Sequence, residues 1–135
     1  MDPIAEGLFI ENPDPRLIGG RRKDTGRVVF PRPSGADEDL YEPILLSPRG
    51  RIWSYTVQQF RPKSPPYDGP DVFEPFILAY VELENEVIIE TRIVGARIED
   101  ITIGAPVRLL LFPFESKRAG GPVKMFGFEL MGEAA

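Results

Sequence analysis

The middle of the chain reads Phe76-Ile77-Leu78-Ala79-Tyr80-Val81-Glu82-Leu83, then Glu84-Asn85-Glu86, then Val87-Ile88-Ile89-Glu90-Thr91-Arg92-Ile93-Val94. Both long stretches are rich in β-branched and apolar residues, which favour strands. The three polar residues between them are typical of a turn. This part of the sequence therefore predicts a β-hairpin.

Upstream of the hairpin, the sequence predicts a long strand at 51–60. Its two faces would carry Ile52, Ser54, Thr56 and Gln58 on one side and Trp53, Tyr55, Val57 and Gln59 on the other. We expect the aromatic face to point inward. The turn Pro48-Arg49-Gly50 precedes this strand, and a shorter apolar strand is expected at 43–47. A proline-rich segment, 61–75, follows the long strand and is too long for an ordinary hairpin loop, which makes it a candidate binding loop.

Downstream of the hairpin, a short element at 97–104 ends at a glycine, and two further strands are expected at 107–114 and 123–130. Five strands with a short element between the third and the fourth match a five-stranded Greek-key barrel of the oligonucleotide/oligosaccharide-binding (OB) type. The fold class is therefore predicted to be all-β, with a β-sandwich as the main alternative.

The N-terminal third is predicted to precede the barrel as an arm and a small hairpin. Residues 1–15 form the arm, in which Leu8 and Phe9 either fill a groove on the domain or dock a partner. Two short strands flank a tight turn at 23–26. The expected boundaries are 1–15 for the arm, 16–41 for the hairpin unit, 42–131 for the barrel and 132–135 for a C-terminal tail.

Composition excludes several classes of function. The 135 residues contain no Cys and no His, which rules out disulfides, thiolate or imidazole metal sites, and catalytic triads that need either residue. With 16 Lys plus Arg against 21 Asp plus Glu, the net charge of −5 argues against partners such as duplex DNA or an anionic membrane. No apolar stretch is long enough for a membrane span, so we expect a cytoplasmic protein.

Six short motifs occur in a characteristic order: Leu17-Ile18-Gly19-Gly20-Arg21, Phe30-Pro31-Arg32, Gly50-Arg51-Ile52-Trp53-Ser54-Tyr55-Thr56, Pro75-Phe76, Ile93-Val94-Gly95 and Ile103-Gly104-Ala105-Pro106-Val107. In this order and spacing, the stretch from Leu17 to Phe128 resembles a known family. Its members are small proteins with an N-terminal zinc ribbon and a C-terminal OB-fold, and they accompany thiolases, thiolase-like acyltransferases and steroid side-chain aldolases.

The sequence departs from this family at the zinc ribbon. The family ribbon carries two Cys-x-x-Cys pairs that hold one zinc ion. Arg22 and Thr25 stand where the first pair should lie, and the second pair falls near Ala36 and Asp39. We therefore expect a cysteine-less ribbon that binds no zinc and is held by apolar contacts from Leu17, Ile18, Val28 and Phe30, or by burial against a partner.

The resemblance implies a non-catalytic accessory subunit. Such a subunit binds a thiolase-fold partner, in a heterotetramer, and helps bind or channel acyl-CoA for carbon–carbon bond cleavage or formation. Because CoA carries phosphates and a long arm, basic side chains and apolar surface are the candidate contacts. The candidate acyl-CoA residues are Arg49, Arg51, Arg61, Lys63, Lys117 and Arg118, if their loops meet at one end of the barrel. The candidate partner contacts are Tyr67, Phe73 and Phe76, with Leu8 and Phe9 in the arm.

Two other classes of function stay open. A barrel of this type can hold single-stranded nucleic acid by stacking bases on aromatic side chains in a basic groove, although the net charge counts against it. Salt-dependent binding of an oligonucleotide would indicate this function. A free-standing enzyme would be indicated by turnover of acyl-CoA by the purified chain alone.

Overall fold

The computed structural model describes residues 3–5, 7–12, 14–58, 75–84, 87–116 and 119–131. The elements are β1 (Phe9–Ile10), β2 (Arg16–Arg22), β3 (Val28–Val29), a 3₁₀ helix η1 (Gly35–Leu40), β4 (Tyr41–Leu45), β5 (Arg49–Gln58), β6 (Phe76–Leu83), β7 (Val87–Ile93), a 3₁₀ helix η2 (Ile98–Asp100), β8 (Pro106–Ser116) and β9 (Gly121–Leu130). None of the helices in the described ranges is long and apolar enough to cross a membrane. The all-β prediction is confirmed.

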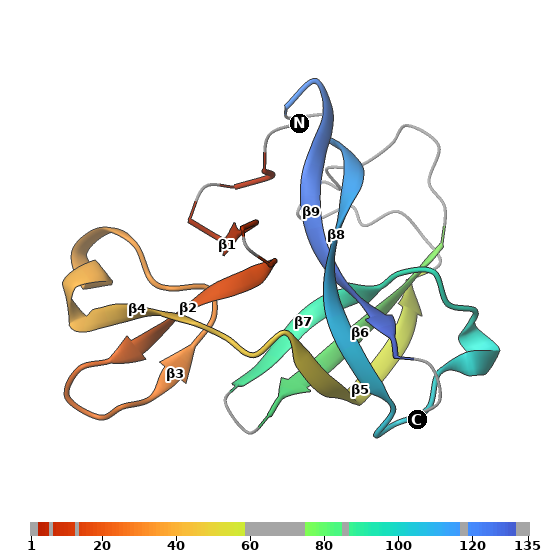
Figure 1. The fold of residues 1–135 in the computed structure, drawn as a ribbon, viewed down its shortest axis with the longest axis horizontal. Coiled ribbons are helices and arrows are strands. Elements are labelled where there is room, and N and C mark those ends of the chain that lie inside the picture. The colour runs from red at the N-terminus through yellow and green to blue at the C-terminus, as the bar shows by residue number, and fades with distance from the viewer. Residues whose placement is uncertain are drawn as a thin grey trace.

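The barrel is closed and contains five strands in the order β5-β6-β7-β9-β8, with β5 pairing β8 to complete the circle (Figure 1). The predicted hairpin is the β6–β7 pair, whose register runs from Ile77 opposite Ile93 to Leu83 opposite Val87. The long β8–β9 ladder and the single parallel pairing of β7 with β9 complete a topology consistent with an OB-fold.

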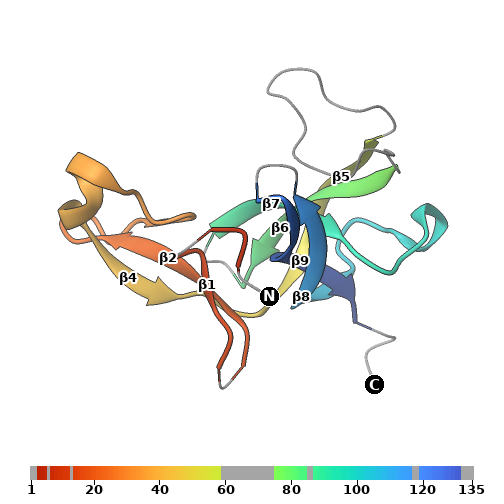
Figure 2. The same ribbon diagram turned by 90° about the horizontal axis from the view of Figure 1, so that it is seen from above.

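The second sheet lies beside the barrel and is built around β2 (Figures 1 and 2). β2 pairs with β1, β3 and β4, all antiparallel. The predicted hairpin around 23–26 is present as β2 and β3. The strand β4 also belongs to this sheet, whereas the sequence placed its residues at the start of the barrel.

One apolar core joins the two sheets. Leu17 of β2 and Leu46 after β4 are fully buried in the same cluster as Val81 and Phe128 of the barrel. The ring of Phe30, just after β3, packs edge-on against Phe126 of β9, with 5.6 Å between the ring centroids. The small sheet is therefore attached to the barrel by apolar contacts, to which Leu17 and Phe30, two of the residues expected to hold the cysteine-less ribbon, contribute.

The N-terminal arm is held along the molecule by backbone and ionic contacts. The N–H of Ile4 donates to the carbonyl of Lys124 on β9 at 2.8 Å, and the N–H of Ile18 donates to the carbonyl of Leu8 at 2.9 Å. The Lys124 ammonium forms an ion pair with the Glu11 carboxylate. These contacts place the arm across β9 and beside β2.

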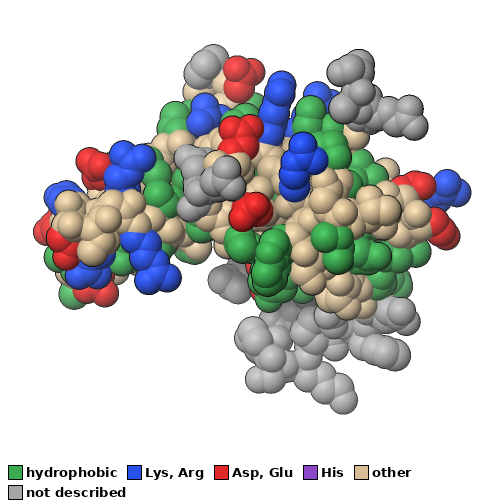
Figure 3. Space-filling model, turned by 90° about the horizontal axis from the view of Figure 1, so that it is seen from below, with side chains coloured by type: hydrophobic (Ala, Val, Ile, Leu, Met, Phe, Trp, Pro, Cys, Tyr) green, Lys and Arg blue, Asp and Glu red, His purple; other side chains and the backbone are tan. Residues whose placement is uncertain are grey.

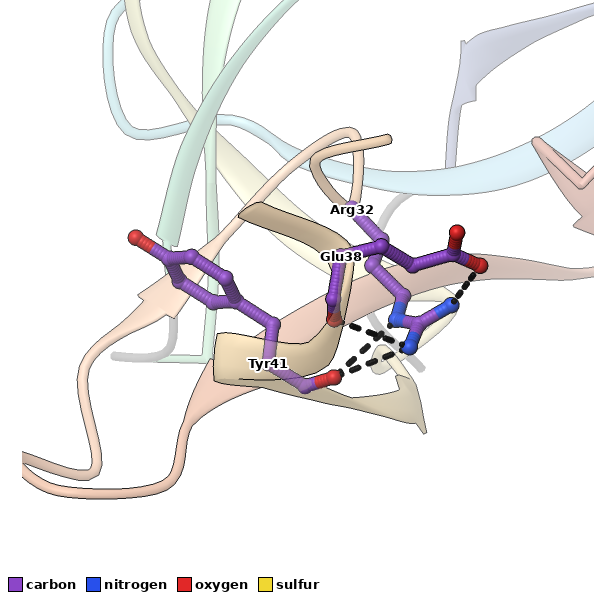
Figure 4. A network of polar contacts seen from close by, with 3 residues as sticks. All are labelled: Arg32, Glu38 and Tyr41. Carbon is purple, nitrogen blue, oxygen red and sulfur yellow. Dashed lines mark hydrogen bonds and ion pairs between the residues drawn. The ribbon is translucent and has the colours of Figure 1, made fainter. Parts of the chain in front are cut away.

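Arg32 is the centre of a polar network that ties the small sheet together (Figure 4). Its guanidinium donates to the carbonyl of Tyr41 from Nε at 3.2 Å and from Nη2 at 2.9 Å. It also contacts Glu38, donating to the backbone carbonyl and to the carboxylate, each at 3.2 Å. Gly20 of β2 leaves room for this side chain, because a Cβ there would lie 3.1 Å from Arg32 Cγ. One arginine thus links β2, η1 and the start of β4.

We expect Arg32→Ala to loosen this sheet and lower the free energy of unfolding by about 1–3 kcal/mol, because a charge-assisted set of hydrogen bonds is lost. Arg32→Lys should recover little of the loss, since an ammonium lacks the planar fork that reaches both carbonyls. Urea unfolding gives the free energy, and amide hydrogen exchange over 35–45 locates the change. Unchanged exchange in that range would mean that the network does not hold the sheet.

Candidate functional site

Large apolar side chains are exposed along one band of the barrel. Trp53 on β5 is 57% exposed, Tyr80 on β6 is 43% exposed, Ile88 on β7 is 42% exposed, and Ile103 after η2 is 69% exposed. We call these four residues the barrel apolar surface. In Figure 3, hydrophobic side chains gather over the lower part of the barrel, while Lys, Arg, Asp and Glu side chains cover the small sheet and also stand on the upper part of the barrel.

The strand register places the four side chains on neighbouring segments. Ser54, next to Trp53, lies opposite Tyr80. Tyr80 lies opposite Glu90, and Ile88 is two residues away on the same outward face of β7. On the other side of β5, the N–H of Gly104 donates to the carbonyl of Ile52 at 2.7 Å, which brings Ile103 beside the strand. The surface therefore crosses four adjacent segments.

The expectation that Trp53 points inward is wrong. The β5–β6 register shifts between Ile52 and Ser54, and Ile52 is the residue that is buried, at 1% exposure. A β-bulge interrupts the alternation of side chains, so the residues before and after it do not share one period. Tyr55, after the bulge, pairs with the buried Ala79 as expected for an inward residue, yet it remains 37% exposed.

Two of the predicted acyl-CoA residues lie together. Arg49 and Arg51 line a cavity of about 450 Å³ with Glu82, Glu84, Pro106 and Met131. The Arg51 guanidinium donates from Nη1 to the carbonyl of Gly104 at 2.9 Å, and Arg51 lies opposite Glu82 in the β5–β6 register. Two arginines and two glutamates balance the charge of this cavity.

The other four basic candidates, Arg61, Lys63, Lys117 and Arg118, lie outside the described residues, as do Tyr67 and Phe73. The strand ends that flank those segments are remote from Arg49 along the ladders. Gln58, at the end of β5, pairs with Phe76, whereas Arg51 pairs with Glu82 at the other end of β6. Ser116, at the end of β8, pairs with Gly121, whereas Arg108 at its start pairs with Arg49.

The remaining partner candidates are partly or fully covered by the chain itself. Phe9 is buried in the core at 8% exposure, and Leu8 packs against the same cluster. This placement favours the role of a strap for the arm over that of a docking segment. Phe76 is half-buried beneath Arg92, whose guanidinium carbon lies 3.6 Å from the centroid of its ring.

One of the four positions where the family has cysteines, Arg22, makes an ionic contact. Arg22 donates from Nε to the Asp24 carboxylate at 2.7 Å. This hydrogen bond lowers the pKa of Asp24 and raises that of Arg22. Because the pKa of Asp24 is lowered by folding, the contact stabilises the turn at neutral pH and is lost as the pH falls through that pKa. Thr25 is exposed in the same turn, and Ala36 and Asp39 are exposed on η1. Over the described ranges, no group of three or more carboxylates could hold a metal ion.

Sequence reasoning missed most of the barrel apolar surface. The residue pattern predicts a core position for Trp53 and gives no prediction for Tyr80, Ile88 or Ile103. For Tyr80 and Ile88 the signal was present, because both alternate with the buried residues Ala79, Val81 and Ile89. For Trp53 and Ile103 the sequence carries no such signal.

Comparison with known proteins identifies the fold and the family. The model of the ChsH2 C-terminal OB-fold domain matches residues 44–112, which is more than half of the chain. A DUF35 domain-containing scaffold protein from Methanocaldococcus jannaschii is 35% identical over 98 residues, covering 67% of this chain and 64% of the relative. The chain thus spans less than two thirds of that relative's length.

Among solved structures, a chain of the Ltp2-ChsH2(DUF35) aldolase superposes with a TM-score of 0.62 and 21% identity, covering 85% of this chain and 84% of the other. This likeness supports the same fold. The family match covers the β4 to β8 region, in which Trp53 and the two arginines of the cavity lie. The chain belongs to the family of the ChsH2 C-terminal OB-fold domain, and the OB-fold that its sequence motifs predicted is the fold of that family.

Proposed function

We propose that this chain is a non-catalytic accessory subunit that binds a thiolase-fold partner through the barrel apolar surface. The observation that carries the proposal is the exposure of Trp53, Tyr80, Ile88 and Ile103 on adjacent segments of one barrel. Exposed apolar side chains grouped on one face of a small domain, here with Glu82 and Glu90 among them, are typical of a protein–protein interface. Exposed Trp and Tyr are also the residue types that contribute most to interface affinity.

The names of the related proteins support an accessory role. The Methanocaldococcus jannaschii relative is a scaffold protein, and the name of the similar structure joins ChsH2(DUF35) to Ltp2 in an aldolase. The chain itself has no Cys or His with which to supply a nucleophile or an imidazole base. We therefore assign the chemistry of carbon–carbon bond cleavage or formation to the partner.

We propose further that the complex, a heterotetramer, binds acyl-CoA with help from this chain. Arg49 is the best-placed basic residue, because it is exposed at the rim of the cavity and has no ion pair among the described residues. Arg51 contributes less, since its guanidinium is bonded to the Gly104 carbonyl and faces Glu82. Arg61, Lys63, Lys117 and Arg118 remain candidates on the same chemical grounds.

A single-stranded nucleic acid has less support as the ligand. The exposed Tyr80 donates its hydroxyl to the Glu90 carboxylate at 3.2 Å, and Glu82 lies on the same outward face of β6. Phosphates require cations beside the stacking side chains. Carboxylates at these positions therefore repel the backbone of a strand that would stack here.

A reconstitution assay tests the proposed function. The thiolase-fold subunit from the native host would be assayed for acyl-CoA turnover with and without this chain. We expect no turnover by the chain alone, and a rate for the subunit that rises when the chain is added. Turnover by the isolated chain, or a partner rate that does not respond to it, would contradict the proposal.

We also propose that the small sheet needs no zinc, since Arg32 and the Arg22–Asp24 pair occupy the part of the chain where metal ligands would stand. Dialysis against EDTA should leave the unfolding midpoint unchanged, and elemental analysis of the purified protein should find no stoichiometric zinc. A midpoint that falls after EDTA and recovers on adding zinc would refute this.

A further inference from the structure

Two further cavities lie between the N-terminal arm and β8. The first, of about 420 Å³, has apolar walls from Ile10, Leu45 and Leu109 and three arginines, Arg16, Arg49 and Arg108. The second, also of about 420 Å³, has apolar walls from Leu111, Phe112 and Pro113, and Asn12 and the Glu11–Lys124 ion pair also line it. Pro15 borders both cavities, so they adjoin along the arm.

The placement of the arginines in the first cavity lowers the stability of the fold. Arg49 and Arg108 lie directly opposite each other on β5 and β8. Like charges at opposed positions in antiparallel strands are destabilising. The Arg108 guanidinium is neutralised by Glu129, with Nε 2.7 Å from the carboxylate. Within the described part of the chain, the Arg49 guanidinium makes no ion pair or hydrogen bond, and only the Arg49 backbone is bonded to the Ser47 hydroxyl.

Arg16 adds a second positive charge without a carboxylate partner among the described residues. Its Nε donates to the carbonyl of Leu46 at 2.6 Å, which fixes the guanidinium without neutralising it. Asp14 is the acidic residue that lines this cavity, against three arginines. In a chain of net charge −5, this is a local excess of positive charge. Local rules of stability are commonly broken in this way at binding sites.

We propose that this cleft binds an anion carried on an apolar chain, such as an alkyl phosphate or a fatty carboxylate. The anionic group would contact Arg49 and Arg16, where charge-assisted hydrogen bonds are available. The apolar chain would lie against Leu109 and continue along β8 toward Leu111 and Phe112, where the second cavity is predominantly apolar. Arg49 also lines the cavity beside Glu82, but Glu82 and Glu84 line that cavity with it, so that side of Arg49 is the poorer site for the anion. This inference concerns the chain alone and does not depend on a partner subunit.

The test is a titration of small-molecule probes into the isolated full chain, monitored by the chemical-shift changes of its backbone amides in NMR. The probes are octyl phosphate and octanoate, with 1-octanol and inorganic phosphate as the separate halves. We expect saturable binding of at least one intact probe, with shifts at 45–49 and 108–112, and at least tenfold weaker binding of each half. A preference between the two intact probes shows whether the natural group is a phosphate or a carboxylate.

Arg49→Gln should weaken the binding of the intact probe about tenfold or more, the loss expected for a charged hydrogen bond. It should leave the unfolding midpoint unchanged or higher, because the opposed Arg108 loses its like-charged neighbour. Arg27→Gln removes the same charge from an exposed turn of the small sheet and should change neither property. Absence of saturable binding, shifts confined to other residues, or equal affinity of the wild type and Arg49→Gln would each overturn the proposal. If the variant does not fold, the positions of the amide shifts in the wild type still show whether the probe binds in this cleft.

Discussion

Replacement of Gly50 by alanine should lower the free energy of unfolding by roughly 3 kcal/mol. Gly50 is buried at the point where β5 pairs with β8 and closes the barrel. A Cβ at this position would lie 2.4 Å from the backbone carbonyl oxygen of Glu82 and 2.9 Å from Val81 Cγ1. Because a backbone atom cannot move aside as a side chain can, the β5–β6 ladder itself must shift. The midpoint of thermal unfolding should fall by about 10 °C.

Gly121→Ala is the matched control for this substitution. Gly121 also lies in a barrel strand, but a Cβ there would meet nothing within 4 Å. Alanine at this position should be neutral or slightly stabilising, because it restricts the unfolded chain. Differential scanning calorimetry of the two variants compares them directly. Equal midpoints would show that the close approach at Gly50 does not constrain the barrel.

Trp53→Ser should weaken binding to the thiolase-fold partner by about 30-fold or more, with little change in stability. The indole is 57% exposed in the isolated chain, so its loss removes little from the core. At the centre of an interface, an aromatic side chain of this size commonly contributes about 2 kcal/mol or more. Surface substitutions usually change the free energy of unfolding by no more than about 0.5 kcal/mol.

Leu40→Ser is the control for the Trp53 variant. Leu40 is exposed to a similar degree, at 44%, but it lies on η1 of the small sheet and outside the barrel apolar surface. Its replacement should leave partner affinity unchanged within about twofold. Biolayer interferometry with the immobilised partner measures both variants. If the two substitutions weaken binding equally, the interface is not centred on the barrel.

The strands were predictable where a local pattern carried the signal. The β6–β7 hairpin follows from two apolar runs around a polar turn, and the β2–β3 hairpin follows from Asp24 to Gly26 between short strands. In both hairpins, strands that follow one another in the sequence also pair with each other in the sheet. The five-stranded barrel was predicted from the number of strands and from the short element between the third and the fourth strand, which contains η2 in the structure.

The orientation of Trp53 was not predictable, because it depends on a bulge rather than on the alternation of residue types. Strand β5 has apolar residues on both faces, and the register shift after Ile52 decides which of them is buried. Likewise, the Arg32 network requires a side chain, a 3₁₀ helix and a strand start to meet in space. A pattern of residue types does not predict which of these groups come into contact in the folded chain.

The candidate site likewise has a part that was predictable from the sequence and a part that was not. The sequence singled out Arg49 and Arg51 as basic residues beside a glycine turn, and the structure places both on one cavity. It did not single out Arg16 and Arg108, because they come together with Arg49 only through the β5–β8 pairing and the path of the arm. Residues distant in sequence form this cleft, so long-range packing was needed to find it.

Purification of the tagged chain from its native host, with mass spectrometry of what accompanies it, tests the accessory-subunit proposal most directly. We predict that a thiolase-fold subunit is recovered with the wild-type chain in a near-equal amount and stays bound to it during gel filtration. Trp53→Ser should reduce the recovery of this subunit, whereas Leu40→Ser should not. Recovery of the wild-type chain alone, as a stable monomer without a thiolase-fold subunit, would contradict the proposal that this barrel serves a catalytic partner.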